Sequence, residues 1–94
     1  MAIAVATTIL QQLGGNRFLI MTGAKDLVGN DDSLTMRLPR NGKNVGRVTV
    51  ALVLGDEYRV TTYSGRGRHL AARYANVAGL RATFEDMTAL RVSL

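Results

Sequence analysis

The sequence predicts an α+β domain with one N-terminal helix, a four-stranded antiparallel meander and a C-terminal helix that packs on one face of the sheet. Apolar residues recur at helical spacing near both ends of the chain and alternate with polar residues in its middle. Turn-forming Gly, Asn, Asp and Pro residues separate the alternating segments. The 94 residues suffice for one hydrophobic core, so we expect a single domain over residues 1–94, with the second sheet face largely free.

The first predicted element is a helix over residues 2–13. Val5, Ile9 and Leu13 are four residues apart, which places them on one side of a helix. The run Gly14-Gly15-Asn16 contains residues that tolerate a positive φ, and it predicts the end of this helix.

The apolar run over residues 18–22 is typical of a strand buried on both faces, and it supplies the first strand of the predicted meander. Gly23 marks a bend, and residues 25–28 are a candidate extension of this strand. The sequence Gly-Asn-Asp-Asp over residues 29–32 predicts a turn.

Three alternating strands follow, over residues 33–38, 45–54 and 57–64. One side of each strand is mainly apolar, and the other side carries Arg and Thr. Pro39 with Asn41-Gly42 predicts the first of the connecting turns, and Gly55-Asp56 predicts the second. The apolar sides contain Leu34, Met36, Leu38, Val48, Val50, Leu52, Leu54, Tyr58 and Val60.

The last third of the chain predicts a loop and a second helix. Residues 64–68, Ser-Gly-Arg-Gly-Arg, are typical of a flexible basic loop. Residues 69–74 are compatible with a helical turn or with an irregular connector. From Asn76, a candidate N-cap, to Leu90 the spacing is that of an amphipathic helix, which we expect to cover the apolar sheet face.

Positive charge is concentrated in stretches that contain no acidic residue. The chain carries a net charge of +5, with ten Arg and two Lys. Residues 33–55 contain no Asp or Glu, and neither do residues 58–84. Arg pairs bidentately with phosphate and carboxylate groups and stacks on bases, so this distribution favours a polyanionic or acidic partner.

The polar side of the predicted sheet is the candidate site. Arg37, Arg47 and Arg59 each have a Thr two residues away on the same side, and residues opposite one another on neighbouring strands lie about 5 Å apart. Guanidinium and hydroxyl groups together suit a phosphodiester backbone. A charged, Thr-rich face is also what a solvated sheet without any ligand looks like. The candidate nucleic-acid-binding residues are Arg37, Arg40, Lys43, Arg47, Arg59, Tyr63, Arg66 and Arg68.

Composition argues against several other classes of protein. The absence of Cys removes disulfides, thiolate nucleophiles and cysteine metal sites, and it fits a reducing compartment, so we expect a cytoplasmic protein. Residues 1–13 have no basic segment and are too short to span a bilayer, so they predict neither a signal peptide nor a membrane helix.

Catalytic and cofactor motifs are missing from the sequence. His69 is the single histidine and has no orienting acid near it in the sequence. Gly65-x-Gly67 lacks both the third Gly of a dinucleotide fingerprint and the Lys of a P-loop. We therefore expect a protein that is not an enzyme and that uses no metal and no cofactor.

Three segments carry a resemblance to a set of known proteins: LGGNRFLIMTGAK over residues 13–25, SLTMRLP over residues 33–39, and the end of the chain from LRATF at residues 80–84 to Leu94. In these segments the chain resembles small uncharacterised proteins of phages, prophages and other mobile elements. The similarity spans most of the chain, and residues 65–74 depart from it. The resemblance implies either an accessory protein associated with DNA or RNA, or an inhibitor of a host defence complex such as an anti-CRISPR.

The sequence thus leaves three hypotheses. The first is a module that binds nucleic acid, DNA or RNA, through backbone phosphates on its basic sheet face and basic loop. The second is an inhibitor whose basic surface binds an acidic host protein. The third is an accessory protein without a ligand that forms a homodimer, since a second copy would add stability to so small a domain.

Overall fold

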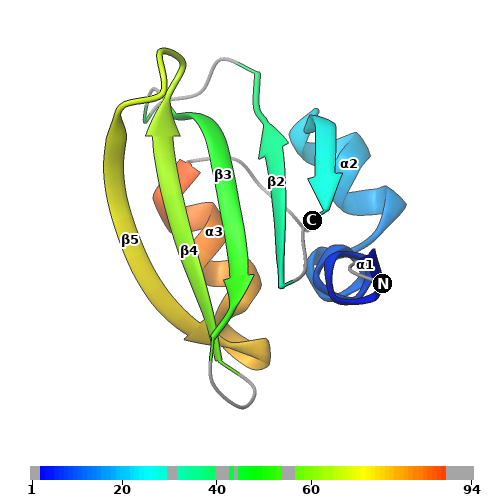
Figure 1. Ribbon diagram of the computed structural model, residues 1–94. Coiled ribbons are helices and arrows are strands. Elements are labelled where there is room, and N and C mark those ends of the chain that lie inside the picture. Colours follow the sequence, from blue (N-terminus) through cyan, green and yellow to red (C-terminus); the bar gives the residue numbers. More distant parts are fainter. Residues whose placement is uncertain (1–2, 30–31, 40–42, 44, 54–56, 89–94) are drawn as a thin grey trace.

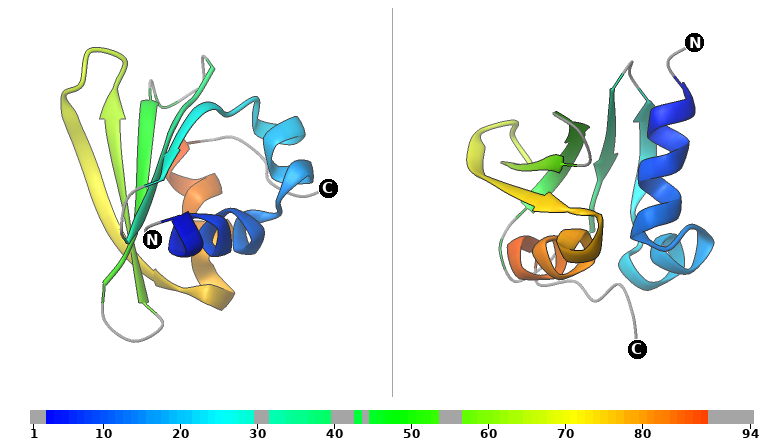
Figure 2. Two further views of the ribbon diagram at one scale, coloured as in Figure 1. Left: turned by 45° about the vertical axis from the view of Figure 1, so that its right-hand side comes forward. Right: turned by 90° about the horizontal axis from the view of Figure 1, so that it is seen from below.

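The chain forms a five-stranded antiparallel sheet with helices on one side (Figures 1 and 2). The computed structural model describes residues 3–29, 32–39, 43, 45–53 and 57–88. The elements in chain order are α1 (Ile3–Leu13), α2 (Asn16–Thr22), β1 (Lys25–Gly29), β2 (Ser33–Arg37), β3 (Val45–Leu52), β4 (Glu57–Ser64), β5 (His69–Asn76), the 3-10 helix η1 (Val77–Gly79) and α3 (Leu80–Thr88).

The sheet is a meander in which each strand pairs with the next one along the chain, in the order β1-β2-β3-β4-β5. Helix α1 contacts β1 and β2, α3 contacts β4 and β5, and the two helices contact each other. Figure 2 shows both helices on the same side of the sheet. The predicted α+β class is confirmed, whereas the prediction of four strands is wrong because β1 and β5 are both separate strands.

The first predicted strand is wrong as well, since residues 18–22 belong to helix α2. Phe18 is fully buried while Ile20 is 81% exposed, which is the one-sided burial of a helix. The Thr22 hydroxyl donates to the Phe18 carbonyl at 2.8 Å, and the N–H of Gly23, which is left-handed, closes the helix on the Leu19 carbonyl at 2.9 Å. A short apolar run does not distinguish a buried strand from a buried helix by its pattern alone.

Strands β1 and β5 account for the two segments that the sequence pattern left without a clear assignment. Residues 25–28 form most of β1, which pairs with β2 instead of extending an earlier strand. Residues 69–74 are neither a helical turn nor an irregular connector, because they belong to the eight-residue strand β5. The Leu-Ala-Ala-Arg sequence in β5 has high helix propensity and no apolar alternation, so tertiary pairing overrides local preference there.

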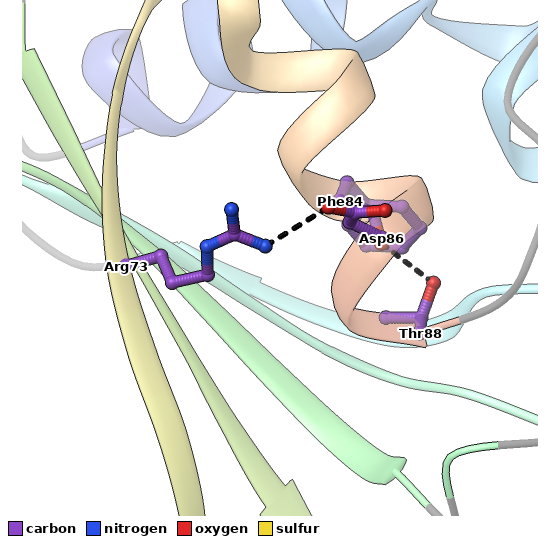
Figure 3. Close-up of polar contacts among 4 residues, drawn as sticks. All are labelled: Arg73, Phe84, Asp86 and Thr88. Atoms are coloured by element: carbon purple, nitrogen blue, oxygen red, sulfur yellow. Dashed lines mark hydrogen bonds and ion pairs between the residues drawn. The ribbon is translucent and has the colours of Figure 1, made fainter.

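The C-terminal helix is confirmed in its described part. Asn76 acts as the predicted cap, because its side-chain oxygen accepts the Gly79 N–H at 2.9 Å. Helix α3 follows η1, and within it the Thr88 hydroxyl donates to the Phe84 carbonyl at 2.8 Å (Figure 3). The turns predicted at Asn41-Gly42 and Gly55-Asp56 lie outside the described residues, as does the predicted helix end at residues 89–90.

The core lies between the sheet and the helices. Phe18 of α2 and Phe84 of α3 are both fully buried and meet edge to face, with their ring centroids 5.0 Å apart. The strands contribute the apolar side of their alternating pattern, as the sequence predicts. The buried cluster consists of Ala6, Ile9, Leu13, Phe18, Leu34, Met36, Leu38, Val45, Val48, Val50, Tyr58, Val60, Leu80, Phe84 and Met87.

Arg73 lies on the helix side of the sheet, unlike the arginines of β2, β3 and β4. It pairs directly with Val60, whose side chain is fully buried in the core. From β5 its guanidinium reaches Asp86 of α3, with Nη1 3.1 Å from Oδ2 (Figure 3). This exposed ion pair joins the edge of the sheet to the helix, and Arg73 is not part of the free face.

In the described part of the chain, no helix is both long and apolar enough to cross a bilayer.

The aromatic contact between α2 and α3 predicts a large stability effect. Replacing Phe18 by Ala should lower the free energy of unfolding by about 3–5 kcal/mol, because a fully buried ring is lost and a cavity remains. The matched control is Ile20→Ala in the same helix, which should cost less than about 1 kcal/mol because that side chain is exposed. Urea denaturation measures both values. Equal losses in the two variants would contradict the helical assignment of residues 16–22.

Candidate functional site

The pairing of the strands determines which side chains share the free face of the sheet. Directly opposed residues point to the same face, and neighbours along a strand point to opposite faces. Met36 pairs with Val48, and both are buried against the helices. Their chain neighbours Arg37 and Arg47 also pair with each other, and these therefore project from the opposite face.

One row of side chains crosses this free face from edge to edge. Its members are joined pairwise by the register, and each comes from a different strand. Three members are cationic and come from adjacent strands, followed by an aromatic residue and a histidine. We call it the basic row, and it consists of Lys25, Arg37, Arg47, Tyr63 and His69.

Contacts within the basic row position its side chains. The Arg47 guanidinium carbon lies 4.8 Å from the centre of the Tyr63 ring, a cation–π arrangement. The Tyr63 and His69 rings meet edge to face at 5.9 Å. Arg37 approaches Asp26, with Nη1 3.6 Å from Oδ2, but the two side chains are 65% and 58% exposed. An exposed ion pair of this length contributes only about 0–1 kcal/mol, so it holds Arg37 weakly.

A pocket of about 400 Å³ opens at the cationic part of the row. Its lining combines cations from three strands with three glycines. A group that enters the pocket can therefore approach both guanidinium groups and the backbone. The lining residues are Lys25, Arg37, Leu38, Pro39, Gly46, Arg47, Ser64, Gly65 and Gly67.

Gly46 allows the backbones of β3 and the β4–β5 loop to come together beside this pocket. It occupies the irregularity between Val45 and Arg47 in the pairing of β3 with β4. A Cβ at residue 46 would lie 2.6 Å from the Gly65 nitrogen and closer still to the Gly65 Cα. Backbone atoms cannot move aside as a flexible side chain does, so only glycine fits at this position.

The basic loop is organised by Ser64. The Ser64 hydroxyl accepts the backbone N–H groups of Arg66 and Arg68, at 3.3 and 3.1 Å. The Gly67 N–H bonds to the Ser64 carbonyl at 2.9 Å, and Gly67 has a φ of 87°, which favours glycine. The loop thus has a defined turn, and the exposed Arg66 and Arg68 lie at the same end of the sheet as the pocket without lining it.

Arg59 shares the free face but not the pocket. It pairs with Ala51 on one side and with Tyr74 on the other. It precedes Tyr63 by four residues along β4, which corresponds to about 13 Å of extended strand. Between them the face is lined by threonines, of which Thr35 and Thr49 share a hydrogen bond at 3.1 Å. The predicted row of Arg37, Arg47 and Arg59 is thus divided, with two arginines together and the third apart.

The remaining predicted residues and one missed residue complete this end of the sheet. Arg40 lies outside the described residues, and Lys43 is exposed between β2 and β3. Lys25 is a pocket residue that sequence reasoning missed, because residues 25–28 were interpreted as the continuation of another strand. Its only sequence signal is that it follows a Gly-Ala break and precedes a short apolar pair.

Charge is segregated along the strand direction. Both the β2–β3 and the β4–β5 connections lie at the pocket end, since they follow Arg37 and Ser64. Among the described residues of the strands and their connections, this end carries six cations and one acid, Asp26. Asp32 and Glu57 lie at the opposite end, where β2 and β4 begin, together with Arg59. The cations at the pocket end are Lys25, Arg37, Lys43, Arg47, Arg66 and Arg68.

Within the described ranges, no three His, Asp or Glu side chains are close enough together to hold a metal ion. Comparison of the chain with protein-family models, with curated proteins and with solved structures finds no match.

The close approach at Gly46 predicts unequal effects of two Gly→Ala changes at the pocket. Gly46→Ala should lower the free energy of unfolding by about 1–3 kcal/mol, since the new methyl group overlaps the Gly65 backbone. Gly65→Ala is the matched control, because a Cβ there meets no atom within 4 Å, and it should change stability by less than about 0.5 kcal/mol. Urea denaturation of both variants gives the comparison. A Gly46→Ala variant as stable as Gly65→Ala would show that the loop does not pack against β3 as described.

Proposed function

We propose that the protein binds nucleic acid, with backbone phosphates held in the pocket by Lys25, Arg37 and Arg47. The observation that supports this most strongly is that cations from three adjacent strands line one pocket on the sheet face away from the helices. Arg47 and Arg37 supply planar donors that match phosphate oxygens bidentately, and Lys25 supplies a point charge. Neutralising phosphates also releases counterions from the polymer.

The glycines of the pocket support a phosphate ligand. Gly46, Gly65 and Gly67 present backbone without side chains, so a sugar–phosphate unit could approach the chain closely. The pocket volume is within the range of sites that take small molecules, so it would accommodate a nucleotide unit of a polymer.

A polymer fits the charge distribution better than a single nucleotide does. Lys43, Arg66 and Arg68 lie at the same end of the sheet but outside the pocket lining, and they would contact neighbouring phosphates. The excess of positive charge at this end would attract a polyanion to it. Phosphate contacts carry no sequence information, so we expect little sequence preference.

The alternative of a protein–protein inhibitor has less support in the geometry. The centre of a protein interface usually contains apolar or aromatic anchors that fill pockets on the partner. Here the pocket is lined mainly by cations and glycines, and Leu38 is already buried in the core.

Charge reversal at two positions of the same face tests the proposal. Arg47→Glu should weaken binding about tenfold or more, because it removes a phosphate contact from the pocket and adds repulsion. Arg59→Glu makes the same charge change about 13 Å away and should weaken binding by no more than about threefold. Fluorescence anisotropy with labelled single-stranded DNA, single-stranded RNA and duplex DNA of equal length measures the affinities.

The salt dependence gives a second readout in the same assay. With three phosphates neutralised, log K should fall with log salt at a slope of about −2 on a single strand and about −3 on a duplex. Arg47→Glu should reduce the slope by about 1. Equal losses of affinity in the Arg47 and Arg59 variants, or an affinity that is independent of salt, would contradict the proposal that the pocket binds phosphates. A host protein that co-purifies after nuclease treatment would favour the inhibitor hypothesis instead.

A further inference from the structure

Among the described residues, strand β5 forms an edge of the sheet that no other strand covers. It is the last strand in the sheet order and spans eight residues. Residues 69–74 are exposed throughout, on both faces, and only Ala75 of this strand is buried. Within the described part of the chain, β4 is the one strand that pairs with β5, so a full row of backbone donors and acceptors points outward.

Both edge strands contain one irregularity in their pairing, which in β5 falls at Leu70, between His69 and Ala71. The opposite edge of the sheet is nevertheless protected more strongly than β5. Strand β1 has five residues, an irregular register between Lys25 and Val28, and a positive φ of 53° at Asp26. Short length, bulges and charges are the usual means by which an edge strand avoids pairing with another chain. Helix α1 also contacts β1. Strand β5 contains no Pro, and its one cation inside the strand, Arg73, is already paired with Asp86.

Apolar side chains on and next to β5 are exposed to an unusual degree for this molecule. Tyr74 is 59% exposed, Leu70 is 43% exposed, and Val77 just after the strand is 42% exposed. These are three of the five large hydrophobic residues that are exposed among the described residues. The edge therefore combines unpaired backbone groups with apolar side chains, which is the combination that adds a further strand to a sheet.

We propose that two copies of the protein pair through β5, antiparallel to each other and related by a twofold axis at Ala72. This register places Ala72 opposite itself, and it places Leu70 of each copy opposite Tyr74 of the other. Aliphatic and aromatic residues on opposite strands form a favourable cross-strand pair. Arg73 is then opposite Ala71, so no like charges are directly opposed.

The strand sequence is what favours a second copy over another peptide. Leu70 and Tyr74 are placed symmetrically about Ala72, so a single twofold axis forms both apolar pairs at once, as an isologous interface requires. The pairing would join the two sheets into one. A single strand contact buries less than the roughly 1,200–2,000 Å² of a standard stable interface, so the dimer should be weak and dependent on concentration.

This interface is independent of the proposed nucleic-acid site. The pocket is lined by residues of β1 to β4, of the segment after β2 and of the β4–β5 loop, and no residue of strand β5 itself lines it. Failure of nucleic-acid binding would leave the dimer proposal unchanged, and the reverse also holds.

Charge pairs at the twofold axis test the proposal. Sedimentation equilibrium of the unchanged protein should show a mass that rises from 10.2 kDa toward twice that value as concentration increases. Ala72→Lys and Ala72→Glu should each remain monomeric, because the substitution places like charges opposite each other across the axis. An equimolar mixture of the two variants should associate again, at least as tightly as the unchanged protein. Circular dichroism checks that both variants are folded.

Disulfide trapping provides a second test that does not depend on affinity. The natural chain contains no Cys, so Ala72→Cys introduces the only thiol. Residues directly opposed in antiparallel strands are close enough for a disulfide, so mild oxidation should convert this variant to a covalent dimer. Ala82→Cys, exposed on α3, is the control and should react far more slowly. A protein that stays at 10.2 kDa at every concentration, a mixture of charge variants that does not associate, or equal crosslinking of both Cys variants would overturn the proposal.

Discussion

The register in which β2 pairs with β3 is the constraint on which both the core and the candidate site depend. Met36 opposes Val48 and Arg37 opposes Arg47, so one pairing fixes which side chains are buried and which face solvent. A slip of one residue would exchange the two sets, burying guanidinium groups and exposing apolar residues. The large cost of burying unpaired charges therefore selects the register that brings the arginines together on the free face.

The same register has an electrostatic cost at the basic end. Arg37 is directly opposite Lys25 on one neighbouring strand and directly opposite Arg47 on the other. Like charges directly opposite each other destabilise a sheet. Among the residues that the structure describes, the contacts that offset this cost are weak: the exposed approach of Arg37 to Asp26, and the stacking of Arg47 on Tyr63. Folding requires these solvent-facing positions to be polar, but it does not require all three of them to be cationic. A bound anion would relieve the repulsion between these cations. Proteins often contain such locally destabilising arrangements at their functional sites.

Sequence reasoning predicted the middle of the sheet well because strict alternation over β2, β3 and β4 identifies both strands and faces. It failed where composition conflicts with tertiary pairing: the apolar run at residues 18–22 is a buried helix, and the Ala-rich β5 has no alternating pattern. Alternation also predicted that Arg37, Arg47 and Arg59 share a face. It could not predict their separation, which depends on register, nor the role of Lys25, which depends on β1 pairing across a bulge.

The central claim, that Lys25, Arg37 and Arg47 of the pocket bind phosphates of nucleic acid, is tested most directly by mapping the contact on the protein. Amide chemical shifts would be followed by NMR during titration with a short oligonucleotide. The account predicts that the largest changes fall on Lys25, Arg37, Arg47 and the pocket glycines, while α1 and α3 change little. Changes centred on the helices, or no changes at a concentration that saturates binding, would contradict it.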